Sequence, residues 1–186
     1  MDISHIEADK SKMQNVKKRF FAMRNGIIAD TLRKAGSPYR IIFGLNLPQI
    51  KEIAAAFGYD ENLATELWLN KETRESRILA PMLVNPSDFD MIKARQWLEN
   101  LTGSTEEIDI LCHSLLRKIN DVTELTDTLY ESDDSLKRYA ALRLMFAQVM
   151  KEPTKIKEKA EKEIARKDPR TMAVAMQLLE EASLYL

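Results

Sequence analysis

The pattern that decides the fold is clearest in residues 104–119, which read STEEIDILCHSLLRKI. The apolar residues of this stretch recur at intervals of three and four: Ile108, Leu111, Cys112, Leu115 and Ile119. This spacing places them on one face of an α-helix, and burial of such a face is the main source of helix stability in water. Ser104 and Glu107 predict a capping box at the start of this helix.

The same spacing recurs along most of the chain, whereas the sustained alternation typical of strands is hard to find. Helices are predicted at 11–35, 48–57, 60–69, 71–84, 88–100, 105–119, 121–130, 133–151, 153–167 and 169–185. Because the connections are short, neighbouring helices should pack antiparallel. We therefore predict an all-α, HEAT-like repeat α-solenoid of stacked antiparallel helix pairs, forming a single domain over residues 1–186. A compact helical bundle is the alternative.

Individual residues predict where these helices begin and bend. Asp168 and Pro169 suit the N-cap and the first position of the last helix. Pro81 lies inside the predicted helix 71–84, where it removes a backbone hydrogen bond, so this segment should bend or divide into two short pieces. Further candidate N-caps are Asn70, Ser87 and Ser132.

Composition excludes several classes of protein. With 186 residues, of which 45% are hydrophobic, the chain can bury a sizeable core. Its single cysteine, Cys112, excludes an internal disulfide and a multi-cysteine zinc site. No P-loop, dinucleotide-binding glycine pattern, HExxH or EF-hand motif occurs, so no cofactor is expected. The N-terminus lacks a signal peptide and no apolar run could span a membrane, so we expect a cytoplasmic protein without membrane contacts.

Charge is distributed unevenly along the chain. Lys and Arg outnumber Asp and Glu in residues 1–59 and 135–186, whereas the acidic residues dominate 60–134. Basic ends around an acidic middle either cradle a polyanion or are ordinary solvated helix faces. A basic stripe on the helix 153–167 presents the same choice, because its Glu residues are spaced to pair with it. The stripe consists of Lys151, Lys155, Lys159, Lys162 and Arg166.

Two further segments carry a more specific pattern, IFGLNLPQIKEIAAAF (42–57) and ATELWLNKETRESRILAPMLV (64–84). They combine a glycine four residues before a helix-starting proline (Gly44, Pro48), a Leu-Trp pair ending at Trp68, and an acidic residue followed by an arginine (Glu75, Arg77). On these features residues 40–186 resemble the DNA alkylation repair family, bacterial alkylpurine DNA glycosylases built from HEAT-like repeats. The resemblance implies a concave basic groove that holds duplex DNA without flipping the damaged base.

The resemblance also assigns candidate site residues. Active members carry a Trp-Asp-x-Val-Asp segment, which matches residues 105–109 and places Asp109 at the catalytic carboxylate's position. Thr105 stands where the family has a tryptophan, and Gln177 stands where a second groove tryptophan is expected. Arg138 matches an arginine that contacts a DNA phosphate. Within the basic stripe, the residues expected to contact DNA as well are Lys155, Lys162 and Arg166.

These residues are compatible with three functions. A glycosylase that excises N3- or N7-alkylated purines would use Asp109 to stabilise the cationic sugar, but without the indoles that exclude water around it. A non-catalytic relative would bind double-stranded DNA of particular structure. A HEAT-repeat scaffold would bind a protein partner instead. His113 lies four residues after Asp109, so the two either form an acid/base pair or a surface ion pair.

Overall fold

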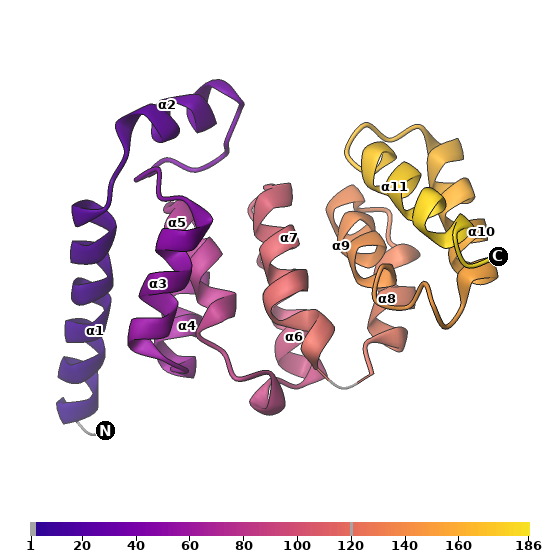
Figure 1. The fold of residues 1–186 in the computed structure, drawn as a ribbon. Coiled ribbons are helices and arrows are strands. Elements are labelled where there is room, and N and C mark those ends of the chain that lie inside the picture. Colours follow the sequence, from indigo (N-terminus) through magenta and orange to yellow (C-terminus); the bar gives the residue numbers. More distant parts are fainter. Residues whose placement is uncertain (1–2, 120) are drawn as a thin grey trace. The chain divides into compact units, whose positions relative to one another are not determined.

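A computed structural model of the chain describes residues 3–119 and 121–186, and its regular elements in these ranges are helices (Figure 1). They form two compact units, Met1–Phe89 and Asp90–Leu186. Within the described ranges, no helix combines the length and the apolar character that crossing a membrane requires. The first unit contains α1 (Ile3–Ala22), α2 (Gly26–Lys34), α3 (Leu47–Phe57), α4 (Glu61–Leu69) and α5 (Arg74–Leu79). Two 3₁₀ turns, Ala80–Met82 and Pro86–Asp88, complete it.

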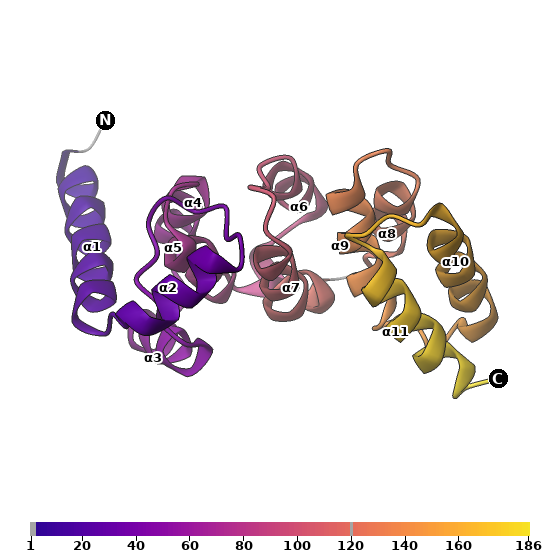
Figure 2. The same cartoon turned by 90° about the horizontal axis from the view of Figure 1, so that it is seen from above.

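The second unit contains α6 (Met91–Leu98), α7 (Thr105–Ser114), α8 (Thr123–Tyr130), α9 (Ser135–Met145), α10 (Pro153–Arg166) and α11 (Met172–Ser183), with a 3₁₀ turn at Leu116–Lys118. Consecutive helices pack as pairs, α8 with α9 and α10 with α11, and α9 also contacts α7 and α11 (Figure 2). In the first unit, α5 packs against α3 and α4, and α1 against α4. The all-α, HEAT-like architecture of stacked helix pairs is thereby confirmed.

Several helix ends differ from the sequence prediction. The predicted helix 11–35 is divided, because the Asn25 side chain accepts hydrogen bonds from the N–H groups of residues 27 and 28 and starts α2. The segment around Pro81 is two short pieces, since α5 ends at Leu79 and a 3₁₀ turn follows. The capping box at residues 104–107 is wrong. Glu107 accepts from the N–H of Thr102 instead, and the Ser104 side chain makes no capping bond.

The remaining N-cap predictions are wrong by two or three residues. The helices begin after Thr73, Asp90, Asp134 and Thr171. At two of these starts a carboxylate makes the capping bond, because Asp90 accepts from the N–H of Lys93 and Asp134 from that of Leu136. At α11 the Asp168 side chain is engaged elsewhere, as described below.

Most of the predicted core is confirmed. The apolar face of α7 is buried from Ile108 to Leu115, and Cys112 is buried within it. Phe20 is buried, whereas its neighbour Phe21 is 58% exposed. On α11 Met176 is exposed, and the buried residues are Val174, Ala175, Leu178 and Ala182.

A fully buried carboxylate organises the first unit. Glu75 on α5 accepts hydrogen bonds from three successive backbone N–H groups, those of Phe43, Gly44 and Leu45, at 2.9–3.3 Å. The Arg74 guanidinium adds a fourth donor at 3.0 Å. Gly44 has a φ of +81°, and a Cβ there would lie 2.1 Å from the carbonyl oxygen of Asn25. Only glycine allows this approach, and the tight turn leads directly into α3.

Trp68 and Arg77, which belong to the same sequence pattern, pack against each other in the first unit. Arg77 is fully buried, and its guanidinium lies 3.4 Å from the centroid of the Trp68 ring. It also donates to the carbonyl oxygen of Trp68. The glycine turn, the tryptophan and the acidic-basic pair of α5 therefore stabilise the fold of the first unit, and none of them is free to bind a ligand.

We predict that Glu75→Gln destabilises the chain by about 2–4 kcal/mol, because one acceptor oxygen is replaced by a donor that faces backbone N–H groups in a buried site. Urea denaturation followed by circular dichroism measures this change. The matched control is Glu72→Gln, which removes an exposed ion pair to Arg40 and should cost less than about 1 kcal/mol. Equal losses in the two variants would contradict the role given to Glu75.

Candidate nucleic-acid interface

The two main candidate residues have different neighbours. Asp109 on α7 contacts the side chains of Tyr139 and Arg143 on α9, whereas Arg138, adjacent to Tyr139, contacts α10 and the turn before α11. Side chains of successive helical residues point about 100° apart. The adjacent residues Arg138 and Tyr139 of α9 therefore contact different neighbours. No hydrogen bond or ion pair joins Asp109 to Arg138 in the described structure.

Asp109 is held by one hydrogen bond and one ion pair from α9. The Tyr139 hydroxyl donates to its Oδ1 at 2.9 Å, and Nε of Arg143 lies 2.8 Å from the same oxygen as an ion pair. The Asp109 side chain is 36% exposed and that of Arg143 is 27% exposed. Both partners contact the same oxygen, Oδ1.

Burial raises the pKa of Asp109 above its usual range, although Arg143 and the Tyr139 hydroxyl partly oppose this effect. The pKa of Tyr139 is also raised, first by burial and then by the adjacent Asp109 charge. The hydroxyl therefore remains protonated and acts as a donor to the carboxylate.

A second arginine lies next to Arg143. Arg117, just beyond α7, donates through its guanidinium to the carbonyl oxygen of Arg143, with Nε at 3.0 Å. Both guanidinium groups lie beside the Phe146 ring, at 5.9 Å and 5.6 Å from its centroid. We call Asp109, Arg117, Tyr139, Arg143 and Phe146 the α7–α9 cluster. It contains two guanidinium groups and one carboxylate, and the charge of Glu106 also acts on Asp109 from outside the cluster.

Sequence reasoning identified only Asp109 of this cluster. Neither Tyr139 nor Arg143 is predicted as a functional residue from the sequence. Their spacing of four residues on α9 was the available signal. His113 is exposed, and the partners of Asp109 come from α9 rather than from its own helix.

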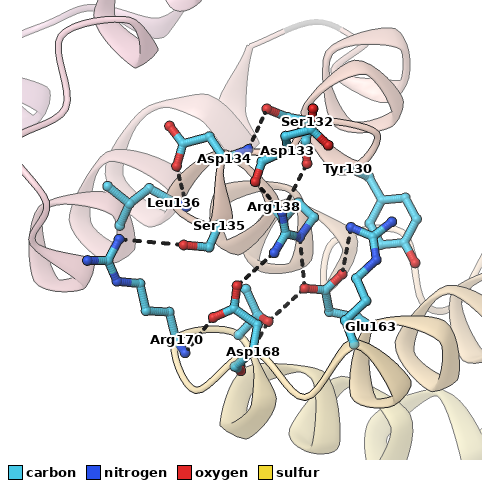
Figure 3. Close-up of polar contacts among 12 residues, drawn as sticks. Tyr130, Ser132, Asp133, Asp134, Ser135, Leu136, Arg138, Glu163, Asp168 and Arg170 are labelled. Atoms are coloured by element: carbon cyan, nitrogen blue, oxygen red, sulfur yellow. Dashed lines mark hydrogen bonds and ion pairs between the residues drawn. The ribbon is translucent and has the colours of Figure 1, made fainter.

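Arg138 is buried within a polar network (Figure 3). Its Nε donates to Glu163 at 3.0 Å and its Nη2 to Asp168 at 2.7 Å. Its Nη1 donates to the carbonyl oxygens of residues 132 and 133 at 3.0 and 2.8 Å. Glu163 is fully buried and also accepts from the Thr171 hydroxyl at 2.7 Å.

This network joins three helices and fixes the turn between α10 and α11. Asp168 accepts from Arg138 through one oxygen and from the N–H of Arg170 through the other. Because four of the five guanidinium N–H groups are used internally, the network explains Arg138 as a structural residue. The expected phosphate contact gains no support from this geometry.

The basic stripe of α10 lies largely against α8. Lys159 pairs with Asp127 at 2.5 Å and lies over the Tyr130 ring, and Lys155 pairs with Asp127 at 3.8 Å and with Glu152 at 3.2 Å. Arg166 pairs with Glu163 at 3.4 Å and lies 5.5 Å from the centroid of the Tyr130 ring. Lys162 is exposed, and no ion pair joins it to the described part of the chain.

The positions of the family's groove tryptophans carry no aromatic ring. Thr105 is the first residue of α7, and Gln177 is exposed on α11. Both tryptophans of the sequence, Trp68 and Trp97, are buried, so neither offers an indole to a bound strand. The α7–α9 cluster therefore presents a neutralised carboxylate and guanidinium N–H groups, which is chemistry suited to an anion.

We predict that Arg138→Met destabilises the chain by about 3–5 kcal/mol, because it leaves the buried Glu163 carboxylate without its main partner. Adding Glu163→Gln to this variant should restore part of the loss, since it removes the buried charge. Denaturant unfolding of both single variants and the double variant measures the coupling. Additive losses would contradict the pairing.

The pH dependence of stability provides a second prediction. A carboxyl whose pKa is raised on folding stabilises the folded chain when protonated, and this contribution is lost as pH rises through the folded pKa. The stability of the native chain relative to Asp109→Asn should therefore increase as pH falls from neutral towards the ordinary value of 3.8. Urea unfolding of both proteins across this range measures the difference. A difference that decreases as pH falls would contradict the raised pKa.

Comparisons with known proteins agree with this fold. One solved structure superposes with a TM-score of 0.81, covering 93% of this chain and 76% of that one at 15% sequence identity. It represents proteins related to the HEAT-like repeat DNA glycosylases with affinity for branched DNA structures. No curated protein matches the chain. The model of the DNA alkylation repair enzyme family matches residues 16–181, which is most of the sequence. The chain is therefore a member of the DNA alkylation repair enzyme family.

Proposed function

We propose that this protein binds DNA through the sugar-phosphate backbone and does not excise bases. The observation that carries the proposal is the ion pair at the position of the family's catalytic carboxylate. Arg143 lies 2.8 Å from Asp109 and the Tyr139 hydroxyl lies 2.9 Å from it. The acid of this site already has a cation as its partner.

Excision of an alkylated purine develops positive charge on the deoxyribose. A carboxylate stabilises that charge only to the extent that its own charge is unopposed in a site from which water is excluded. At Asp109 the guanidinium of Arg143 opposes this charge. Each 1.4 kcal/mol of lost transition-state stabilisation lowers the rate about tenfold. The missing indoles remove a further source of water exclusion.

The same charges favour a phosphate. The two terminal nitrogens of Arg143 make no hydrogen bond or ion pair within the described residues, and the side chain is partly exposed. Terminal guanidinium nitrogens bind phosphate oxygens in a two-pronged geometry. We assign the phosphate contact to Arg143, in place of the buried Arg138.

Two further observations support DNA as the ligand. The family to which the chain belongs acts on DNA, and the structural relative has affinity for branched DNA. Exposed basic side chains outside the cluster supply additional phosphate contacts in this proposal. Lys162 is the member of the predicted stripe that is best placed for this role, because Lys155, Lys159 and Arg166 have acidic partners.

Fluorescence anisotropy with labelled duplex and branched DNA at two salt concentrations tests binding, and release of methylated purine from alkylated duplex tests excision. We expect salt-dependent binding without base release. Arg143→Gln should weaken binding and lower the slope of log K against log salt by about one, as expected for one lost phosphate contact.

The matched control is Arg95→Gln, which removes a partly exposed arginine of the same unit that pairs with Glu124. Its affinity for DNA should remain that of the native chain. Base release that disappears in Asp109→Asn would establish the glycosylase instead. Absence of DNA binding at low salt would leave the protein-interaction scaffold as the function.

A further inference from the structure

The first unit contains a half-open cavity of about 490 Å³ between α1, the segment 41–43 and the start of α5. One wall is apolar and is formed by Phe21, Ile41 and Phe43. Phe21 is an aromatic side chain with 58% of its surface exposed, although the adjacent Phe20 is buried. An exposed aromatic ring that lines a cavity of this size is typical of a ligand site.

The other lining residues are polar, namely Lys17, Asn70, Glu72, Thr73 and Ser76, and the Glu72 carboxylate pairs with Arg40 at 2.6 Å. The Asn70 amide nitrogen lies 3.4 Å from the hydroxyl oxygens of Thr73 and Ser76, at the outer limit of hydrogen bonding. The Thr73 side chain makes no capping bond to α5, although it occupies the N-cap position. An amide and two hydroxyl groups can each donate to or accept from the edge of a planar heterocycle.

One lining residue of the cavity is basic, and a second basic side chain packs on the ring of Phe21. Lys17 lines it from α1 and makes no ion pair within the described part of the chain. The Arg24 guanidinium lies 3.8 Å from the centroid of the Phe21 ring and donates to the carbonyl oxygen of Phe21. An aromatic ring backed by a guanidinium and flanked by a lysine offers a stacking surface with positive charge beside it.

We propose that this cavity binds an unpaired nucleobase together with its adjacent phosphate. Phe21 stacks on the base, the Asn70 amide and the Thr73 hydroxyl contact its edge, and Lys17 contacts the phosphate. This proposal rests on the proposed function, which is DNA binding. It adds that the bound DNA contains an unpaired base, which a fully paired duplex lacks. A branch point in DNA supplies such an unpaired base. An aromatic side chain of a bound peptide would also fit the apolar wall, but it would have no phosphate for Lys17 to contact.

The test uses the full chain and two duplexes of equal length, one fully paired and one with a single unpaired 2-aminopurine nucleotide. Anisotropy measures affinity, and 2-aminopurine fluorescence reports stacking of the unpaired base. The native chain should bind the unpaired substrate more tightly and quench its fluorescence. Phe21→Ala should lose about tenfold in affinity for that substrate, abolish the quenching, and leave binding of the paired duplex unchanged.

Lys17→Gln should lower affinity for the unpaired substrate and keep the quenching. The controls are Tyr59→Ala, an exposed aromatic residue outside the cavity, and Lys51→Gln, an exposed lysine on α3. Both controls should match the native chain. Binding of both duplexes with equal affinity and without quenching would overturn this proposal and leave backbone binding intact. Failure to bind either duplex would overturn both.

Discussion

A carboxylate that is buried away from water needs hydrogen-bond donors, and this requirement determines local structure in both units of the protein. Glu75 is satisfied by three backbone N–H groups and Arg74, which fixes the glycine turn before α3. One oxygen of Glu163 accepts from Arg138 and from the Thr171 hydroxyl, which fixes the turn between α10 and α11. In each case an arginine contributes to the buried network, although its guanidinium could be mistaken for a ligand-binding group.

The same requirement determines what the Asp109 position can do. Its partly buried carboxylate is stabilised by Tyr139 and Arg143, and the cation that stabilises it also cancels its charge. A site with this balance attracts an anion more readily than a cationic sugar. The family's architecture is retained. Our proposal that the protein binds DNA without excising bases rests on this balance of charge at Asp109.

Helix positions and buried faces could be predicted from the sequence, because the spacing of apolar residues such as Ile108 and Leu111 depends only on the period of a helix. Helix starts could not be predicted with the same accuracy. Glu107 accepts from the nearby N–H of Thr102 in place of a capping bond, and Asp168 pairs with Arg138, which is 30 residues away in the sequence. The structural role of Arg138 was hidden for the same reason, as Glu163 lies 25 residues away. A match to a family motif located Asp109 but gave no information on Arg143, which neutralises it.

A crystal structure of the chain with a short duplex would test the central claim most directly. The account predicts that Asp109 remains paired with Arg143 and Tyr139, that the terminal nitrogens of Arg143 contact a phosphate, and that Arg138 stays within its buried network. An Asp109 carboxylate released from Arg143 and facing a deoxyribose ring would contradict the account, because the carboxylate would then be available for excision chemistry.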